Sequence, residues 1–386
     1  MKEGATRRFW VATHRYVGLC SLTFLGLAAI TGVILCFRGP IDRGLNPDLF
    51  RLAVPSARVD PLFVDGILAR THPELRVVGF PLRPRKGEAL AVQVAAARPP
   101  AKLGYDQVFL DPQGRIQGVR RTRAGWDRRH LMQGIYLLHY TLLAGDLGRW
   151  FMGAVAIAWL ISNFVGLYLT FPKRAPFLRQ WLRSWRFKPT RSLPRLLLDL
   201  HRLGGLWALI GLCLLAYTSV GMNFFDEAFT PVVERLWPPR PSPFDRPVVA
   251  AAGPRIGFDR AVVIAGGEAR RRLGLVPANV AYDAERGFYG VMLTRSGAVS
   301  YRGLGPVYLD VDAGDGHIVF EDNPYTDSLA RQLSRSLFPL HSGQVAGGLG
   351  VAVVLLLGLT TLGECITGAY VWWKRRPGRV AARAPR

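Results

Sequence analysis

Four of the seven histidines in this 386-residue chain lie beside long apolar segments. They are His14, His139, His201 and His341. Paired imidazoles from facing helices are a common way for a helical bundle to hold haem iron. A lone histidine at a helix end is more often an interfacial anchor or a contact to the helix dipole. The elements that carry these histidines decide between the two interpretations.

An internal duplication relates the four histidines in two pairs. At an offset of 187 residues, the segment HRYVGLCSLTFLGLAAITGV from His14 matches HRLGGLWALIGLCLLAYTSV from His201, including Thr31 and Thr218. At an offset of 202, LHYTLLAGDLG around His139 matches LHSGQVAGGLG around His341. We expect a pseudo-twofold axis along the membrane normal. Such an axis predicts that the members of each pair face each other.

Four segments are long and apolar enough to cross a membrane, namely 16–37, 150–171, 203–225 and 345–373. At about 1.5 Å of rise per residue, such lengths span the ~30 Å hydrocarbon layer. The first segment exceeds the apolar part of a signal peptide and no small-residue cleavage site follows it, so we expect it to be retained. The sequence therefore predicts an integral membrane protein with a four-helix bundle, built from the duplication. Gly343 and Gly347 form a small-xxx-small motif that predicts close helix packing.

The net charge of +23 is concentrated in the first fifteen residues, in 173–200 and in 374–386. Basic residues beside membrane spans mark the cytoplasmic side, so the charge needs no nucleic-acid partner. Both termini are then cytoplasmic and two long segments lie outside. The predicted organisation is a cytoplasmic N-terminus with the first helix (1–37), a first outer domain (38–148), the second helix (149–172), a cytoplasmic basic loop (173–202), the third helix (203–225), a second outer domain (226–340), the fourth helix (341–373) and a cytoplasmic basic tail (374–386).

The two outer segments share a pattern of one helix followed by short strands. In the first, DPLFVDGILART predicts the helix, and LRVVGF, ALAVQVA and QVFLDPQGRIQGV predict strands, the last folded into a hairpin. In the second, FDRAVVIAGGEARRRLG predicts the helix, and VPANVAYD, GFYGVMLT and PVYLDVDAGDGHIV predict the strands. Each outer segment is therefore expected to be a small α+β domain.

The paired histidines predict two b-type haems, one near each membrane face. Two axial histidines fill the coordination sphere of the iron, which suits electron transfer rather than oxygen chemistry. Zinc or copper is disfavoured because no third Cys, His, Asp or Glu recurs beside the pairs. The rival interpretation is a duplicated anchor, since duplication also copies unimportant residues.

Other ionisable residues accompany the pairs. Arg15 and Arg202 directly follow the two inner histidines, where their guanidinium groups either bind haem propionates or anchor the helices on the inner side. Glu364 lies well inside an apolar segment, which predicts proton transfer, a polar contact or a quinone-type donor site. His130 precedes His139 and has no histidine counterpart, so it is a substitute ligand if the outer haem is offset. His72 and His317 are expected on the surface.

A basic segment, RRTRAGWDRR, precedes the second apolar segment. It predicts either a docking surface for an anionic or aromatic electron acceptor or a contact with lipid headgroups. Its arginines are Arg120, Arg121, Arg123, Arg128 and Arg129.

The histidine-bearing segments THRYVG, LHRLGG, LLHY and PLHSG, together with GAYVWWKRR near the C-terminus, resemble the PepSY-associated transmembrane family. Within it, length and arrangement resemble the iron-regulated inner-membrane siderophore reductases of the FoxB/PiuB kind. The resemblance covers about residues 8–376, and the outer domains match it only in pattern. It implies two periplasmic PepSY-type domains, a bacterial inner-membrane location, reduction of ferric siderophores with release of Fe(II), and haem ligation by the four histidines.

The sequence and the resemblance together predict an oxidoreductase with two b-type haems that passes electrons across the membrane to a ferric siderophore or a similar iron chelate. The electron donor is expected to be a flavoprotein or a quinol, since no flavin or nicotinamide fingerprint appears in the chain. The alternative is a haem-free membrane scaffold or regulator whose PepSY-type domains bind a peptidase or another envelope partner.

Overall fold

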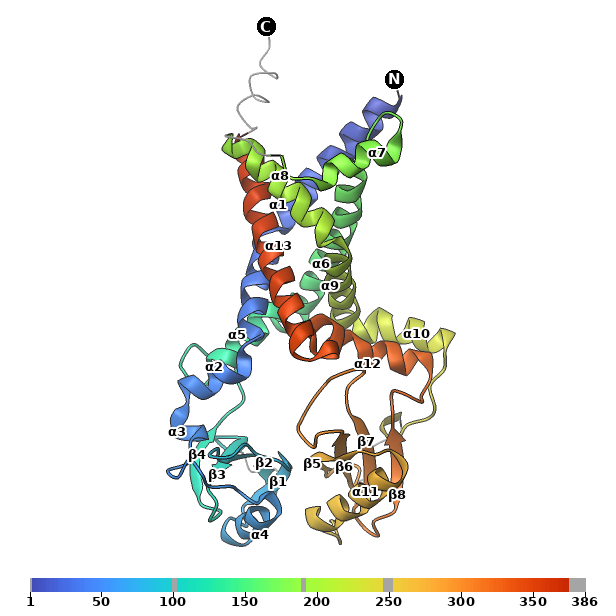
Figure 1. Cartoon of the computed structure of the whole chain (residues 1–386). Helices are drawn as coiled ribbons and strands as arrows, with labels where there is room; N and C mark the ends of the chain where they lie inside the picture. Colours follow the sequence, from blue (N-terminus) through green and yellow to red (C-terminus); the bar gives the residue numbers. More distant parts are fainter. Residues whose placement is uncertain (1, 99–102, 189–191, 246–252, 375–386) are drawn as a thin grey trace. The chain divides into compact units, whose positions relative to one another are not determined.

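The computed structural model describes residues 2–98, 103–188, 192–245 and 253–374 (Figure 1). The chain divides into two compact units. The helical unit comprises 1–37, 135–231 and 340–386, and the sheet unit comprises 38–134 and 232–339. Of the predicted basic tail 374–386, all but Lys374 lies outside the described residues.

Three helices of the helical unit are long and apolar enough to cross a membrane: α1 (Lys2–Leu35), α6 (Gly145–Thr170) and α13 (Gly348–Lys374). The third predicted segment, 203–225, is not one straight helix. It is divided between α8 (Leu193–Trp207) and α9 (Leu209–Asn223), which meet at 68°. Paired glycines just before the break weaken the helix there. The bent pair adds a fourth span if both helices cross the membrane together.

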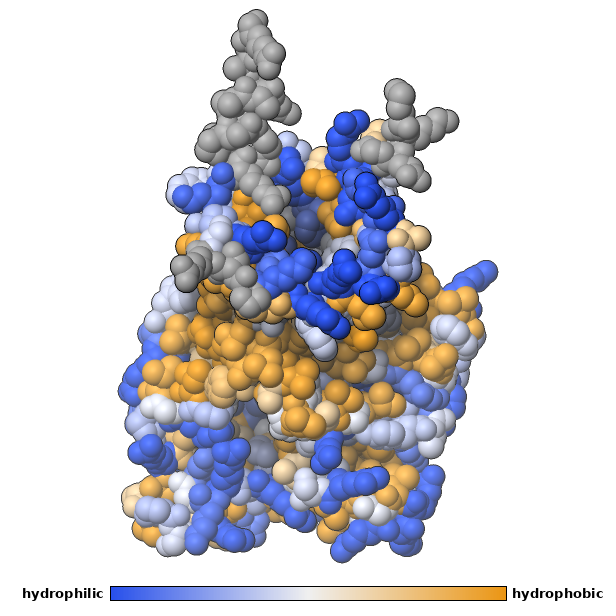
Figure 2. Space-filling view, turned by 45° about the horizontal axis from the view of Figure 1, so that its top comes forward, coloured by the Kyte–Doolittle hydropathy of each residue, from blue (hydrophilic) through white to orange (hydrophobic). Residues whose placement is uncertain are grey.

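Hydrophobic side chains cover much of the surface of the helical unit. Figure 2 shows a broad hydrophobic area on the face in view. Leu349 on α13 and Ile210 on α9 are 75% and 85% exposed. Few residues in the apolar windows of the three long helices are buried inside the protein. Exposed apolar surface of this extent is suited to lipid rather than to water.

The sequence had suggested that His139 and His341 lie at the ends of the spanning helices. The structure places them on separate shorter helices instead. His139 is on α5 (Leu131–Thr141) and His341 is on α12 (Leu329–Ser342), and each of these helices precedes a long one. The corner between α5 and α6 contains Leu142 and Leu143, both with positive φ. The corner between α12 and α13 contains left-handed Gly343.

The motif Gly343-x-x-x-Gly347 is therefore part of the sharp corner between α12 and α13, and its interpretation as a helix-packing motif is wrong. Both glycines have positive φ, at 74° and 62°. A Cβ on Gly350 would lie 2.0 Å from the carbonyl oxygen of Gly343, and a Cβ on its repeat counterpart Gly148 would lie 1.7 Å from that of Thr141. Glycine is needed at both corners because the backbone folds tightly back on itself.

The packing of the helices repeats with the duplication. α1 packs against α13 and α6, while α8 and α9 pack against α13 and α6 respectively. An exchange of the two halves of the chain converts one set of contacts into the other. The helical unit therefore has the approximate twofold arrangement that the repeat predicted.

The sheet unit contains the predicted helix and strands of both halves. The helices are α4 (Pro61–Thr71) and α11 (Phe258–Arg272). The strands of the first half are β1 (Leu75–Pro81), β2 (Leu90–Ala96), β3 (Gln107–Leu110) and β4 (Ile116–Arg120). The strands of the second half are β5 (Val276–Asp283), β6 (Phe288–Thr294), β7 (Val307–Asp312) and β8 (Ile318–Asp322). The described part of the chain also contains the shorter α-helices α2 (Arg38–Leu45), α3 (Pro47–Phe50), α7 (Phe177–Trp181) and α10 (Thr230–Leu236), together with short 3₁₀ and π segments.

The two halves form one sheet instead of two separate domains. The strand order is β4-β3-β2-β1-β5-β6-β7-β8, and all neighbours are antiparallel. β1 pairs with β5 around Phe80 and Val280. A Cβ on Gly79 would lie 2.7 Å from the carbonyl oxygen of Val280, so a side chain there would push the two halves apart.

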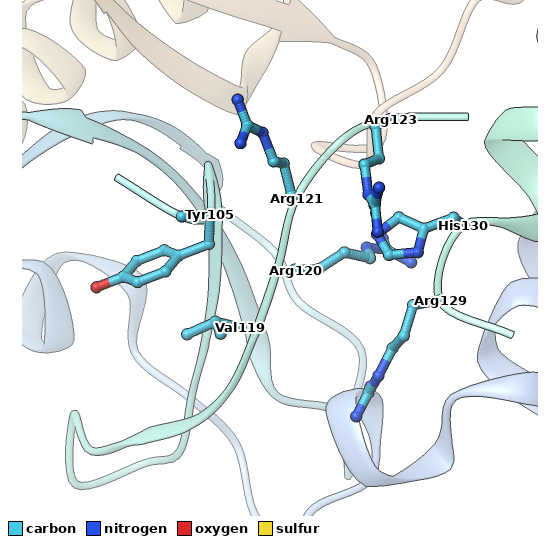
Figure 3. Close-up of a pocket in the computed structure, with 8 residues that line it drawn as sticks. Tyr105, Val119, Arg120, Arg121, Arg123, Arg129 and His130 are labelled. Atoms are coloured by element: carbon cyan, nitrogen blue, oxygen red, sulfur yellow. The ribbon is translucent and has the colours of Figure 1, made fainter. Parts of the chain in front are cut away.

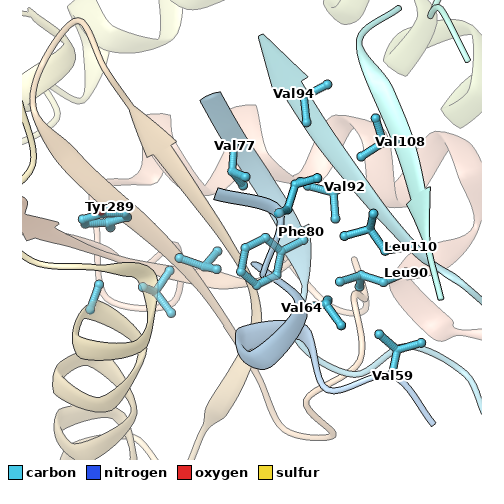
Figure 4. Packing of buried hydrophobic residues seen from close by; sticks show 14 of the residues in the cluster. Val59, Val64, Val77, Phe80, Leu90, Val92, Val94, Val108, Leu110 and Tyr289 are labelled. Atoms are coloured by element: carbon cyan, nitrogen blue, oxygen red, sulfur yellow. The ribbon is translucent and has the colours of Figure 1, made fainter. Parts of the chain in front are cut away.

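One hydrophobic core continues across this junction. It combines Phe80, Val92 and Leu110 from the first half with Val291 and Leu309 from the second, all at most 1% exposed. Figure 4 shows Phe80 between Val77, Val92 and Val64, with Tyr289 of the other half nearby. Separation of the halves would expose both sides of this core, so the sheet unit is expected to unfold as one piece.

Candidate functional site: two facing histidine pairs

The structure brings the two members of each predicted histidine pair together in the helical unit, with their rings steeply inclined to each other. The ring centroids of His14 and His201 are 6.2 Å apart, at an interplanar angle of 66°. Those of His139 and His341 are also 6.2 Å apart, at 62°. Each pair joins one residue from each half of the chain, as the twofold arrangement requires.

The pairs lie at opposite ends of the helical unit. His139 contacts Thr31, which follows His14 by 17 residues on the single helix α1. At ~1.5 Å per residue, that interval corresponds to about 26 Å along the helix. The separation is close to the thickness of the hydrocarbon layer, so one pair belongs near each face of a membrane that α1 would span.

Each of the four histidines has its Nδ1 atom hydrogen-bonded to a hydroxyl oxygen. His139 contacts Thr31 Oγ1 at 2.9 Å, and His341 contacts Thr218 Oγ1 at 3.1 Å. His14 and His201, named the inner pair, are held in the same way as His139 and His341, named the outer pair. His14 contacts Ser162 Oγ at 2.9 Å, and His201 contacts Thr367 Oγ1 at 3.1 Å. The match of Thr31 with Thr218 in the repeat already pointed to the outer contacts, whereas the inner ones had no signal in the sequence.

The contacts of these hydroxyl groups favour a proton on Nδ1 of each ring. Thr31, Thr218 and Thr367 each donate their own hydrogen to a backbone carbonyl one turn earlier, at 2.7–2.8 Å. Their oxygen lone pairs therefore accept from Nδ1–H of the histidine. For His14 the backbone oxygen of Ser162, 3.2 Å away, can only accept. In this tautomer all four rings keep a bare Nε2, the form in which imidazole binds a metal.

Glycines let the helices pass close to the inner rings. A Cβ on Gly166 would lie 3.3 Å from Cε1 of His14, and a Cβ on its repeat counterpart Gly368 would lie 3.3 Å from Cε1 of His201. Gly18, one turn after His14, would meet nothing within 4 Å. At Gly205, the equivalent position after His201, a Cβ would have its only contact at 3.8 Å. The missing side chains at these two positions leave open space beside the rings.

That space is a cavity of about 630 Å³ whose lining includes both inner histidines and both glycines. Its size is within the range of ~300–1,000 Å³ that is usual for sites of small molecules and cofactors. Much of the rest of its lining is apolar, from α1, α6, α8, α9 and α13. A largely apolar cavity with two bare imidazole nitrogens is suited to a flat, hydrophobic metal-containing group.

Arg15 and Arg202 line the same cavity. Arg202 is bound to Asp199, at 3.0 Å, and to the carbonyl oxygen of Arg186. Among the described residues, Arg15 has no carboxylate partner and lies beside the ring of Tyr16. Arg15 is therefore the freer of the two guanidinium groups for an acidic substituent of a ligand in the cavity.

Glu364 makes the inner site asymmetric. Its Oε2 atom lies 2.8 Å from Nδ1 of His201, whereas the repeat-equivalent residue beside His14 is the neutral Ser162. A second difference accompanies the carboxylate. A Cβ on Gly204 would lie 2.4 Å from Glu364 Oε1, and the residue equivalent to Gly204 in the first half is Val17. Glycine at 204 makes room for the carboxylate at 364.

The donor set fits a bis-histidine haem at each pair. At a metal–imidazole bond of about 2.0–2.1 Å, one metal between two imidazoles sets their ring centres roughly 6 Å apart. Both measured separations, 6.2 Å, agree with this value. Among the described residues, the cluster of three potential metal ligands is Asp312, Asp315 and His317 in the turn after β7, so neither pair has the third protein ligand that zinc sites have.

The remaining histidines have other partners. His130 Nδ1 is bound to Asp127 at 2.7 Å, and its Nε2 accepts from Arg123 at 3.4 Å, which leaves it no free nitrogen for a metal. His72 and His317 pair with Glu74 and Asp315 on the surface, as expected.

A second cavity, of about 380 Å³, lies in the sheet unit and is named the arginine pocket (Figure 3). It is formed at the edge strand β4 and the segment that follows. Its lining residues are Gly104, Tyr105, Val119, Arg120, Arg121, Arg123, Arg129 and His130. The basic segment identified in the sequence therefore forms a concave site.

Comparison with known proteins identifies one family. The model of the PepSY-associated TM region matches residues 11–375, nearly the whole chain. No curated protein matches the sequence.

Proposed function

The chain belongs to the PepSY-associated transmembrane family, and from this premise we propose that it is a dihaem b-type reductase of the bacterial inner membrane. In this proposal it takes electrons from a quinol or a flavoprotein and delivers them to a periplasmic ferric siderophore or a similar chelate, which then releases Fe(II). The observation that carries the proposal is the presence of two histidine pairs with 6.2 Å between ring centres. The four-helix count, the periplasmic orientation and the cytoplasmic termini are part of the same proposal.

His14 and His201 would hold one haem, and His139 and His341 the other. A haem with two axial histidines supplies one-electron transfer and has no open position for oxygen. The hydroxyl groups of Ser162, Thr367, Thr31 and Thr218 hold the Nδ1 side of each ring, which leaves Nε2 for the iron. Arg15 supplies positive charge beside the inner site for the acidic groups that a haem carries.

The acceptor step follows from the chemistry of iron. One electron converts Fe(III) to Fe(II), and the hard oxygen ligands that hold Fe(III) tightly hold Fe(II) far less well. The separation of the two histidine pairs, about 26 Å along α1, supports a route from one membrane face to the other. The chain's own part is to place the two sites at this spacing and to keep them out of water.

The first experiment is a measurement of haem per chain. Protein purified in detergent from cells supplied with haem should be red, contain two haems per chain and show a Soret band that shifts on addition of dithionite. A colourless but folded preparation would contradict the proposal and would favour the haem-free scaffold.

Single substitutions then test the pairing. We expect His14→Ala and His201→Ala each to remove one and the same haem, and His139→Ala and His341→Ala each to remove the other. His130→Ala is the matched control and should retain both haems, because its nitrogens are bound to Asp127 and Arg123. If His14→Ala and His341→Ala remove the same haem, the pairing is wrong.

A further inference from the structure

We propose that the arginine pocket of the sheet unit binds a small polyanion that carries two or more carboxylate or phosphate groups. The pocket has about 380 Å³ of space and is lined by Arg120, Arg121, Arg123, Arg129 and His130. This inference does not rest on haem in the helical unit, and it applies equally if the chain is a scaffold.

The arginines of the pocket, together with Arg128 beside Arg129 in the sequence, outnumber the carboxylates that bind them. Arg120 is bound by both oxygens of Asp42, at 2.8 and 2.9 Å, and packs against the rings of Phe50 and Phe109. Its role is therefore structural. Arg121 and Arg123, both exposed, form no ion pair among the described residues. They supply two positive charges that the protein itself leaves unneutralised.

A third excess charge comes from a shared carboxylate. Arg128 and Arg129 both bind Asp48, so that one negative charge serves two positive ones. Burial works against ionisation of Asp48, but hydrogen bonds from the two arginines hold its pKa below the ordinary value. Nη1 of Arg129 is buried and has no hydrogen-bond partner within the described part of the chain. A donor of this kind is stabilised by an acceptor that the protein does not provide.

The fold does not require arginines at these positions, because the second half of the sheet lacks them. β4 and β8 are equivalent at an offset of 202 residues, and both are edge strands of the sheet. The residues that correspond to the five arginines are Asp322, Asn323, Tyr325, Ala330 and Arg331, only one of them basic. The same local structure is therefore built with little positive charge, so the cluster in the first half serves a purpose specific to that half.

The kind of ligand follows from the side chains. Guanidinium groups bind carboxylate and phosphate oxygens in pairs, and several guanidinium groups favour an anion with several such groups. His130 extends the set: its Nδ1 is bound to Asp127, so its Nε2 accepts from Arg123 and helps to position it. A pocket of this size, open to solvent, accommodates a compact polyanion. Such groups come either from a soluble anion or from an anionic lipid headgroup.

Isothermal titration of the full-length protein in neutral detergent tests the proposal, with pyrophosphate and citrate as probes. We expect at least one probe to bind, and the affinity to fall as salt is added. Replacement of both Arg121 and Arg123 by Gln should weaken binding by at least ~10-fold, because each loses a charge-assisted hydrogen bond. Arg115→Gln, an exposed arginine in the turn before β4, is the matched control and should bind as the wild type does.

The proposal is overturned if neither probe binds, or if the double variant binds as tightly as the wild type while its melting temperature is unchanged. Nanodiscs separate the two sources of the anion. If the probe binds equally in phosphatidylcholine nanodiscs and in nanodiscs that contain cardiolipin, whose headgroup carries two phosphates, the ligand is a soluble polyanion. If cardiolipin abolishes probe binding in the wild type and the same charge density of phosphatidylglycerol, which has one phosphate per lipid, does not, the cardiolipin headgroup itself occupies the pocket.

Discussion

Replacement of Glu364 by Gln should raise the reduction potential of one haem and leave the other unchanged. Glu364 Oε2 lies 2.8 Å from Nδ1 of His201, and its side chain is 20% exposed. A carboxylate in this position makes the imidazole a stronger electron donor and favours the oxidised, more positive state of the iron. Gln keeps the size and an acceptor oxygen but removes the charge.

The size of the effect follows from the hydrogen bond. Bonds to charged groups contribute about 1.5–3 kcal/mol and neutral ones about 0.5–1.5 kcal/mol, a difference of about 1 kcal/mol. For a one-electron couple a tenfold change in equilibrium corresponds to ~59 mV, so this difference is about 40 mV. The outer pair contacts the neutral hydroxyl groups of Thr31 and Thr218 and not Glu364, so its potential should not move.

Spectroelectrochemical titration of the purified protein, resolved into two one-electron components, measures both potentials. Glu364→Ser should behave like Glu364→Gln, because it recreates the neutral environment that Ser162 gives His14. Glu268→Gln, on the outer face of α11, is the control for a lost charge elsewhere. The reasoning is refuted if both haems remain bound and neither potential changes, or if both shift equally. Absence of haem in the wild type would instead refute the proposed function.

Three further outcomes are expected. Gly204→Val should expel the Glu364 carboxylate and remove one haem in the haem assay, and addition of Glu364→Ser should restore it. Gly79→Val should reduce the free energy of unfolding of the sheet unit by a few kcal/mol, because its side chain meets the backbone of β5, and this loss should appear as a lower melting temperature. Burial and two nearby carboxylates raise the pKa of Asp310 to about 7 from 3.8, so stability should fall as pH rises from about 4 to 7. Asp310→Asn should reduce this slope in pH-dependent melting curves, and Asp65, whose pKa is raised to about 6, should account for a remaining part below pH 6.

The histidine pairs could be predicted from the sequence because the duplication fixes which residues are equivalent. Two copies of a helix pair related by a twofold axis bring equivalent positions together, so His14 identifies His201 without any knowledge of the helix bounds. The Nδ1 contacts were harder to predict. Thr31 and Thr218 are equivalent, whereas Ser162 and Thr367 come from non-equivalent positions and depend on the rotation of α6 and α13.

The corners of the helical unit were missed for a physical reason. Leu142 and Leu143 adopt positive φ although neither is glycine, asparagine or aspartate, so their side chains give no turn signal. Hydropathy also continues through the corner, since these two leucines are as apolar as the residues of a membrane helix. The bend at Ala208 is marked only by the glycines before it, and glycines in membrane helices have several uses.

The joining of the two halves into one sheet was not predictable from strand patterns. β1 and β5 are about 200 residues apart, and each reads as a strand of its own small domain. The pattern of a strand shows which side chains face the core, but it does not identify the neighbour on its open edge. Gly79 allows the backbone of β5 to lie close to β1, but the sequence does not show which strand the glycine makes room for.

The duplication also allows equivalent residues of the two halves to be compared. Residues shared by both halves are distinguished in this way from residues found in one half only. Gly166 and Gly368 are identical and contact equivalent inner rings, so a paired site requires both. The carboxylate of Glu364 occurs in one half only, which makes the inner pair more electron-rich than the outer pair held by neutral hydroxyl groups. If both pairs hold haem, electrons therefore run downhill from the inner site to the outer one, and the asymmetry of the repeat sets the direction of transfer.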